Sequence, residues 1–431
     1  MPSTILVALC ITALIRQPLP AQNGTEHRVV AAVDEGAAGA LELLQEIVNI
    51  NSGTMNFAGV RRVGAVLRAR FDALGFDTEW IDGAPFDRAG HLLATHDGPG
   101  PRLLLIGHLD TVFEPDHPFQ AWEWTSDSTA RGPGVVDMKG GDVVIVLALE
   151  ALARAAVLDG LNIAVVMTGD EEDSGTPLDL ARASLIEAAD AADVALAFEN
   201  GDSDPTTAVI ARRGSTTWRL SVTGRPAHSS QVFQPEVGAG AIYEASRILF
   251  AFYDELSGEP LLTFNPGVIL GGTDVDFDID QARGTAFGKD NVVAEHAMVS
   301  GDLRAVSPEQ LANAKLAMRR IADGHLPLTT ADLEFHDSYP PFAPTDGNRR
   351  LLALFDAVSR GLGFGAVTAV DPRKAGAADV SFTMGRVAMA LDGLGTGGGN
   401  DHTADEWIDV RTLAMQAKRA AVLMLRLAAG Q

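Results

Sequence analysis

Histidines and carboxylates end several apolar runs of this chain, and these residue types suit metal-assisted hydrolysis. His108 and Asp110 end one run, and three consecutive acids, Asp170, Glu171 and Glu172, end another. Like charges repel, so such a triplet is either a solvated loop or is neutralised by a cation. Imidazole and carboxylate groups are natural zinc ligands at neutral pH, and one carboxylate can bridge two ions. The pattern therefore indicates a metal centre, with a solvated loop as the alternative.

Three further segments offer ligands of the same kind. Glu199 ends another apolar run, Asp137 stands in a glycine-flanked turn before a helical pattern, and His402 lies in a flexible glycine-rich loop. Asp110 follows His108 by two residues and could fix the tautomer of that imidazole. Each of these residues alone is more often a surface or capping group. Only their joint placement favours a common site.

The elements that must position these residues alternate between strand and helix. This alternation predicts an α/β fold, with a mostly parallel sheet covered by helices on both faces. The carboxyl ends of parallel strands share one rim of a sheet, so the polar residues that follow the runs should meet there. The expected strands are 102–110, 162–172, 192–200 and 387–395, and the expected helices are 140–158 and 409–428.

The middle of the chain has a different order, β-α-β-β-α-β, which is typical of a split βαβ, ferredoxin-like α+β domain. Ser307, Pro308 and Gln310 form a start signal for its second helix. We therefore expect an inserted dimerisation or lid domain over 215–338, between two parts of a catalytic domain at 22–214 and 339–431. Its expected elements are 215–224, 235–256, 260–272, 295–306, a helix from Ser307 to about residue 323, and 331–339.

Composition bounds the function. The chain has 431 residues, of which 46% are hydrophobic and 21% charged, which is typical of a globular protein with a large core and two domains. Its net charge is −24. Because there is no basic excess to neutralise phosphates, nucleic acid and anionic membrane surfaces are poor candidate partners.

The N-terminus resembles a signal peptide. Residues 5–15 form an apolar run that is too short to span a bilayer, and Ala21 offers a small residue for cleavage, although no basic residue precedes the run. We expect a signal peptide at 1–21 and a periplasmic or secreted protein. The alternative to a signal peptide is an uncleaved disordered or anchoring tail, and the alternative localisation is cytoplasmic. The only cysteine, Cys10, lies in this segment, so the mature chain would have no thiol for disulfides or catalysis.

The motifs together resemble a known family, from about residue 35 to the end of the chain. This family is the zinc metallopeptidase and deacylase family of glutamate carboxypeptidase, aminoacylase and acetylornithine deacetylase, and the chain is most similar to the glutamate carboxypeptidase branch. The matching segments, in order, are Gly107 to Thr111, Gly134 to Gly141 with Asp137, Asp170 to Glu172, Glu199, and the glycine-rich loop with His402 and Glu406.

The resemblance implies two zinc ions per subunit. His108 and Glu199 would hold one ion, Glu172 and His402 the other, and Asp137 would bridge them. Glu171 would be the general base on a zinc-bound water, with Asp110 beside His108 as a further catalytic residue. Neighbouring side chains of an extended segment point to opposite sides, so Glu172 can face a metal while Glu171 faces substrate.

The inserted domain also carries residues that match the family. The resemblance implies that His228 stabilises the oxyanion, often across a homodimer interface, and that Asn291 and Arg304 bind the free carboxylate of a small peptide or N-acyl amino acid. Arg213 and Lys374 are possible helpers. In the substrate loop the chain has Gly376-Ala377-Ala378-Asp379 where many relatives have Gly-Gly-Thr-Asp, which bears on the substrate rather than on the metals.

Three interpretations compete. The chain is a hydrolase of an amide next to a free carboxylate, either a carboxypeptidase or an N-acyl amino acid deacylase, or it is a silent metal-binding module, or an aminopeptidase of the same fold. Glu171 disfavours the silent module because it is not needed to bind metal. Glu199 disfavours the aminopeptidase because such relatives tend to have Asp there. A phosphate-binding interpretation of the glycine-rich loop fails because no Gly-Lys-Ser/Thr follows.

Overall fold

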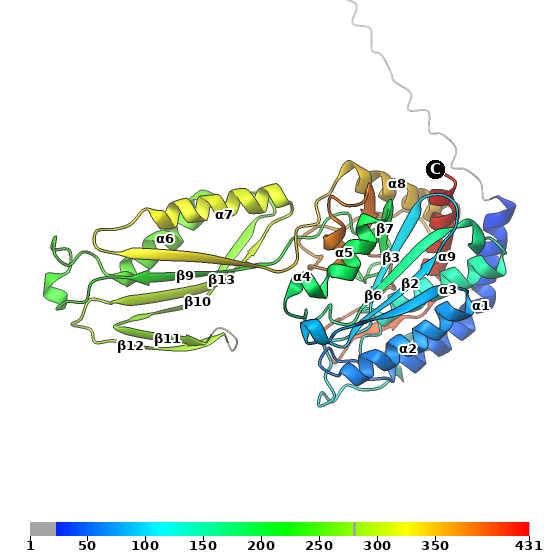
Figure 1. Ribbon diagram of the computed structural model, residues 1–431, viewed down its shortest axis with the longest axis horizontal. Coiled ribbons are helices and arrows are strands. Elements are labelled where there is room, and N and C mark those ends of the chain that lie inside the picture. The colour runs from blue at the N-terminus through cyan, green and yellow to red at the C-terminus, as the bar shows by residue number, and fades with distance from the viewer. Residues whose placement is uncertain (1–22, 279–281, 431) are drawn as a thin grey trace, which may run out of the picture.

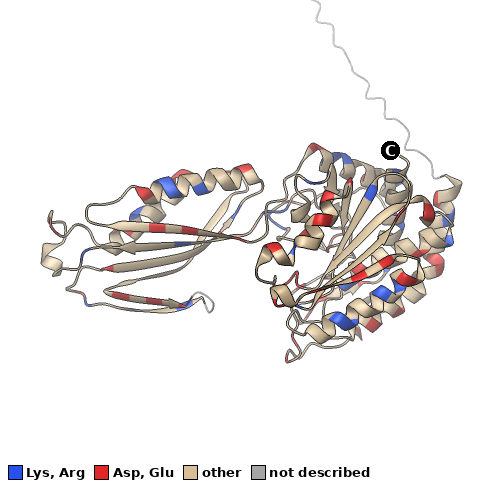
Figure 2. Ribbon diagram, in the orientation of Figure 1, with Lys and Arg blue, Asp and Glu red and all other residues tan. Residues whose placement is uncertain are grey.

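A computed structural model describes residues 23–278 and 282–430, and it shows two domains of different construction (Figure 1). The expected signal peptide, Cys10 included, lies outside these residues. Within them, no helix has the length and apolar character needed to cross a membrane. Acidic residues are spread over the elements of both domains (Figure 2), in keeping with the negative net charge.

The catalytic domain contains a six-stranded sheet, and its central strands β6, β3, β7 and β16 are parallel to one another. Strands β1 and β2 extend the sheet in antiparallel fashion. The expectation of a mostly parallel sheet is therefore confirmed. In sheet order the strands are β1 (Asp77–Asp82), β2 (Gly90–His96), β6 (Asn162–Thr168), β3 (Arg102–His108), β7 (Val194–Ala197) and β16 (Met389–Leu391).

Helices cover both faces of this sheet, which explains why its central strands are apolar between their end residues. In β3, Leu103 and Leu105 pack into the core under α1, α2, α3 and α9, while Leu104 and Ile106 pack into a second core beside α5. The helices of this domain are α1 (Gly24–Val48), α2 (Phe57–Ala73), α3 (Lys139–Arg154), α4 (Leu178–Ala181), α5 (Ala183–Asp190), α8 (Asp346–Gly361) and α9 (Arg411–Ala428).

Short strands tie the loops of the catalytic domain together. The segments around Asp137 and His402 are joined through one small sheet, because β18 pairs with both β17 and β5. These strands are β17 (Gly398–Gly399), β18 (Trp407–Asp409), β5 (Thr129–Arg131) and β4 (Glu123–Trp124), and a separate pair is β8 (Thr207–Ala208) with β15 (Thr368–Ala369).

The inserted domain is an antiparallel sheet with two helices on one face, and it extends away from the catalytic domain (Figure 1). Its sheet runs from Thr216 to Asp337 in the sequence, within the expected range, and Ser307 accepts a hydrogen bond from Gln310 N at the start of α7. In sheet order its strands are β10 (Thr263–Gly272), β13 (His296–Arg304), β9 (Thr216–Thr223) and β14 (Thr330–Asp337), and its helices are α6 (Ala241–Leu256) and α7 (Pro308–Asp323).

One element of the inserted domain was not expected. A hairpin of β11 (Asp274–Asp278) and β12 (Arg283–Phe287) follows β10 and contacts β10 and β13. It is an addition to the six-element β-α-β-β-α-β order, which is otherwise present.

Candidate metal centre

The candidate site lies where three neighbouring strands of the catalytic sheet end. His108 is the last residue of β3, Glu199 follows the end of β7, and Glu172 follows the end of β6. These three strands are adjacent and parallel, so their carboxyl ends meet at one rim. The loops that carry Asp137 and His402 complete the site.

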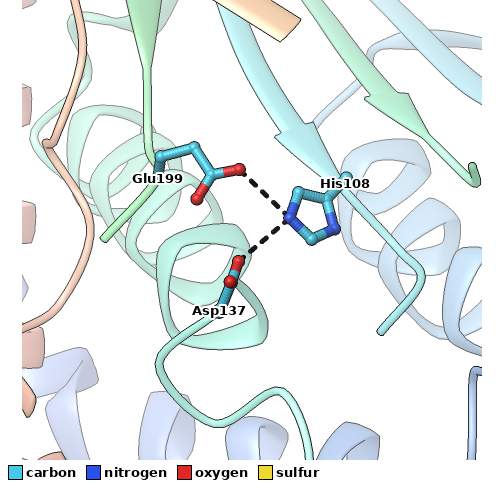
Figure 3. Close-up of side chains that lie close together, drawn as sticks. All are labelled: His108, Asp137 and Glu199. Carbon is cyan, nitrogen blue, oxygen red and sulfur yellow. Dashed lines mark hydrogen bonds and ion pairs between the residues drawn. The ribbon is translucent and has the colours of Figure 1, made fainter. Parts of the chain in front are cut away.

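One group of three side chains converges around the His108 ring (Figure 3). His108 Nε2 lies 3.2 Å from Asp137 Oδ1 and 3.1 Å from Glu199 Oε1. All three residues are buried. A single ring nitrogen between two carboxylate oxygens is the arrangement expected of three ligands around one cation.

A second group shares Asp137 with the first. His402 Nε2 lies 3.1 Å from Asp137 Oδ2 and 3.2 Å from Glu172 Oε2. The two oxygens of Asp137 thus face different histidines, as a bridging carboxylate requires. The other oxygen of Glu172, Oε1, is buried and has no hydrogen-bond partner among the described residues. Nitrogen and oxygen donors of these types fit a pair of zinc ions.

The electrostatics of the site show an excess of negative charge. Burial would lower the pKa of His108, but Glu199, Asp110 and Asp137 outweigh it and hold this pKa well above its ordinary value. Hydrogen bonds that Asp137 and Glu172 accept from the imidazole raise the pKa of His402 to about 11. Burial and the charge of Asp137 raise the pKa of Glu172 to about 7. The carboxylates of the two ligand groups therefore favour a positive charge between them, and metal cations would supply it.

Asp110 holds His108 and the backbone of the acidic segment in place. His108 Nδ1 lies 3.1 Å from the backbone oxygen of Asp110 and 3.4 Å from its Oδ1, so the other ring nitrogen faces Asp137 and Glu199. The carboxylate of Asp110 also accepts hydrogen bonds from the backbone N–H groups of Glu171 and Glu172, at 3.0 and 3.1 Å. Asp110 therefore positions both the imidazole and the acidic segment.

The three consecutive acids have different surroundings. Asp170 is fully buried and pairs with Arg182, whose Nη1 lies 2.6 Å from Asp170 Oδ1. One of the three charges is therefore neutralised by the protein itself, whereas the expectation from the sequence was solvent or a metal cation. Glu171 lies beside Glu172 without belonging to either ligand group. Burial and the charges of Glu199, Asp379 and Glu172 raise its pKa well above the ordinary value, although His108 opposes them.

Glu406 has a positioning role that was not expected from the sequence. It is fully buried, and its carboxylate accepts hydrogen bonds from the backbone N–H groups of Gly134, Val136 and Asp137 at 2.8–3.1 Å. Glu406 stands four residues after His402, so it ties the loop of one ligand to the loop of the bridging ligand. The sequence signal for this role was the position of Glu406, four residues after the ligand His402.

His228 and Asn291 lie together, but the structure does not bring them to the ligand groups. Both are exposed, and Ser229 N donates a 2.9 Å hydrogen bond to Asn291 O. They lie beyond the end of β9, at the end of the inserted domain farthest from the catalytic domain. Strand β9 has eight residues, so its length alone separates them from the linker by about 26 Å.

The expected cations of the substrate site lie at the near end of the inserted domain. Arg304 ends β13, and its Nε donates to Asp302 Oδ1 at 2.9 Å. Arg213 Nη1 donates to Thr263 Oγ1 at 2.8 Å, and its pKa is lowered by burial and by the neighbouring charge of Arg304. Lys374 is exposed and lies 4.0 Å from an oxygen of Asp202.

Arg212 is a buried cation next to Arg213, and no role was expected for it from the sequence. Its Nε donates to Asp392 Oδ2 at 2.6 Å, its Nη1 donates to Gly376 O, and its Nη2 has no partner among the described residues. Burial would lower its pKa, but Asp392, Glu199 and Glu171 raise it. Its charge therefore acts close to the site. The apolar stretch just before Arg212 was the signal for its burial.

Comparison with protein families gives a match over most of the chain. Residues 104–426 match the family model described as "Peptidase family M20/M25/M40". The matched range includes all the residues of both ligand groups.

Individual proteins give the same result. The chain is 26% identical over 431 residues to carboxypeptidase G2 of Pseudomonas sp. (strain RS-16), which covers 99% of this chain and 98% of that protein. It is 28% identical over 387 residues to a succinyl-diaminopimelate desuccinylase of Xanthomonas oryzae pv. oryzae, covering 86% and 94%. Among solved structures, a dinuclear metal binding peptidase of the M20 family from Bacillus subtilis is similar with a TM-score of 0.65 at 14% identity, covering 92% of this chain and 99% of that chain.

Proposed function

Because the chain belongs to peptidase family M20/M25/M40 and is a metal-dependent hydrolase of that family, we propose that it is a two-zinc carboxypeptidase of the glutamate carboxypeptidase type. The observation that carries this proposal is Asp137, whose two oxygens face His108 and His402 in two ligand groups. The substrate is a small peptide or N-acyl amino acid with a free carboxylate beside the scissile amide.

Glu171 is the proposed general base. Zinc ions held by the two ligand groups would polarise the scissile carbonyl and lower the pKa of the attacking water to about 7. Glu171 accepts a proton from this water and returns it to the leaving nitrogen. Asp110 holds the backbone of Glu171 during both transfers, because it accepts a hydrogen bond from Glu171 N.

The proposed anchor for the substrate carboxylate is Arg304, assisted by Arg213. A guanidinium group forms charge-assisted hydrogen bonds with a carboxylate, each contributing about 1.5–3 kcal/mol. Arg304 is half-buried and has only a neighbouring aspartate, Asp302, as its ion-pair partner among the described residues. The net negative charge opposes anionic substrates at long range, but salt screens this repulsion beyond about 10 Å.

We also propose that His228 and Asn291 act on the site of a partner subunit in a homodimer. In one chain they lie about a strand length from the linker, so they cannot reach their own ligand groups in this arrangement. Helix α6 beside them exposes Ile242, Tyr243 and Phe250, which a second copy would cover.

The nearest alternatives remain within the same family. An N-acyl amino acid deacylase is favoured by the desuccinylase relatives, whose identity to this chain is similar to that of the carboxypeptidase. An aminopeptidase would need an anchor for a substrate amine rather than for a carboxylate. Substrate screening separates these three activities.

The general base is tested with Glu171→Gln. This variant should bind both metal ions, because Glu171 is not a ligand, and should lose activity by orders of magnitude. Metal analysis and steady-state kinetics measure the two properties on the same preparation. Activity close to that of the parent protein, with unchanged metal content, would contradict the assignment.

The substrate class is tested with matched pairs of substrates. Purified protein with zinc is assayed against N-acyl amino acids and C-terminal dipeptides, glutamate derivatives first, and against the same compounds with the carboxylate amidated. Loss of one charge-assisted hydrogen bond should reduce kcat/KM by roughly tenfold to two-hundredfold. Arg304→Ala should cause a similar loss for the free acid and little for the amide. Equal hydrolysis of acid and amide would favour the aminopeptidase.

A further inference from the structure

Two linkers join the domains, and they are paired with each other. Ser338 N donates to Ser215 O at 3.0 Å, and Ser215 N donates to Tyr339 O at 2.8 Å. Arg212 and Phe342 exchange both of their backbone hydrogen bonds, at 2.9 and 3.0 Å. Tyr339 is therefore part of the connection through which the chain leaves the inserted domain.

The side chain of Tyr339 enters the catalytic domain and is only 8% exposed. Its hydroxyl donates to the backbone oxygen of Glu171 at 2.9 Å and accepts from Arg182 Nη2 at 2.6 Å. Ser174 Oγ donates to the same hydroxyl at 3.2 Å. A buried phenol with this many partners has a fixed position.

The environment of Arg182 explains why Tyr339 is held so firmly. Arg182 is fully buried between the acids Asp170 and Asp379, with contacts of 2.6 and 2.8 Å. Its guanidinium group lies 5.5 Å from the centre of the Tyr339 ring, and Phe382 packs against that ring edge-on at 5.2 Å. Tyr339 is therefore anchored to charged groups whose removal would leave buried ions unpaired.

Both polar backbone groups of Glu171 are held from opposite directions. Its N–H donates to Asp110 at 3.0 Å, and its C=O accepts from Tyr339. Asp110 belongs to the rim of the sheet, whereas Tyr339 belongs to the linker. The orientation of the peptide groups that flank Glu171 therefore depends on both.

We propose that Tyr339 is a positioning residue for Glu171, and that it connects the linker of the inserted domain to the general base. This inference rests on the proposed function, because it takes Glu171 to be the base. Without the tyrosine hydroxyl, the Glu171 carbonyl loses its partner, and the side chain samples orientations that are unproductive for proton transfer. Tyr339 touches no proposed ligand side chain, so we expect the metal content to be kept. Because the Glu171 carbonyl belongs to the peptide group that leads to the ligand Glu172, the metal content has to be measured as well.

The test is a double-mutant cycle of Tyr339→Phe with Glu171→Gln. Tyr339→Phe should lower kcat on the order of tenfold with KM changed by less than about twofold. If Tyr339 acts through Glu171, adding Tyr339→Phe to Glu171→Gln should not reduce the residual turnover further. Single-turnover assays with excess protein make that residual rate measurable.

One variant serves as the control. Tyr253→Phe removes the hydroxyl of an exposed tyrosine on α6. It should keep kcat within about twofold of the parent. Metal content and Tm are measured for every variant, so that a loss of fold or metal is detected directly.

The outcomes separate this inference from the proposed function. Equal fractional losses on adding Tyr339→Phe to the parent and to Glu171→Gln would overturn the positioning role, as would a loss explained by lower metal content, or an unchanged kcat. Full activity in Glu171→Gln itself would instead overturn the proposed function.

Discussion

The ligand groups of the catalytic domain and the far end of the inserted domain differ in how their polar residues are held. His108, Asp137 and Glu199 are buried, and other residues of the same domain fix their positions. His228 and Asn291 are exposed. The His228 ring contacts Ser230, two residues further on, and the backbone of Asn291 accepts a hydrogen bond from Ser229.

This difference indicates that the two regions need different partners, metal cations in one case and a protein surface in the other. The ligand groups require only cations, because every donor is already in place. The far end of the inserted domain presents a histidine and an amide to solvent, with exposed apolar side chains of α6 nearby. We infer that a second protein surface completes it, which is the dimer proposed above.

The largest expected effect comes from breaking the catalytic-domain cluster at its shared residue. Asp137→Asn removes one anionic oxygen between two histidines and replaces it with an amide N–H₂ that cannot bind a cation. Activity should fall roughly a hundredfold or more, with metal content below two ions per chain. Metal analysis after dialysis, beside kinetics, checks this prediction.

The control for this change is Asp401→Asn, which removes an equal charge from an exposed position next to His402. It should retain the activity and metal content of the parent. If Asp137→Asn kept both ions, the bridging role of this residue would be wrong.

A smaller effect is expected when two inactive variants are mixed, so that one chain supplies His228 to the site of the other. His228→Ala and Glu171→Gln should each be nearly inactive alone. In a hybrid dimer, the chain with intact Glu171 receives His228 from the other chain, so one of its two sites is complete. Equal mixing with full subunit exchange should therefore restore about a quarter of the parent activity.

Sedimentation or light scattering must show a dimer in the same buffer. A mixture no more active than the average of its two components, measured under demonstrated subunit exchange, would contradict the action of His228 in trans. His228 would then act within its own chain or not at all.

The smallest expected effect concerns the stability of the inserted domain. Glu244 of α6 has a fully buried side chain, and it accepts hydrogen bonds from Arg247 at 2.7 and 3.0 Å and from Leu326 N at 3.0 Å. Burial opposes its ionisation, but these hydrogen bonds outweigh burial and lower its pKa below the ordinary value. A carboxylate with a lowered folded-state pKa stabilises the fold above its unfolded-state pKa, and this contribution is lost as pH falls through the folded-state pKa.

Glu244→Gln should therefore lower the free energy of unfolding by about 1–3 kcal/mol at neutral pH, and the difference from the parent should shrink below about pH 4. Thermal unfolding of both proteins between neutral pH and pH values below about 4 measures this difference. Glu236→Gln, at an exposed position, is the control. A difference that grew on acidification would contradict the sign.

The part of the fold that could be predicted from the sequence is the part specified by local patterns. Apolar runs and their polar ends predicted the parallel strands and the rim on which His108, Glu172 and Glu199 lie, because both faces of those strands are buried. The hairpin of β11 and β12 was missed although β11 alternates acids with apolar residues, which is typical of a strand. Each strand has only five residues, and β12 does not show the alternation.

Contacts between distant segments could not be predicted in the same way. The pair of Arg182 and Tyr339 joins residues 157 positions apart, and nothing in either local sequence indicates the other. The same holds for Glu406 and the backbone around Asp137, which lie about 270 positions apart. Such pairs follow from the arrangement of the elements, which the sequence patterns left open.

The loop of His402 has a consequence for how the protein is made. The inserted domain uses one continuous stretch, Thr216 to Asp337, and can complete its contacts while the rest of the chain is still on the ribosome. His108, Asp137, Glu172 and Glu199 precede the inserted domain in the chain, whereas His402 and Glu406 follow it. The first ligand group can therefore assemble before the inserted domain is made. The second ligand group, and the support that Glu406 gives to the Asp137 loop, can form only after the inserted domain has been synthesised.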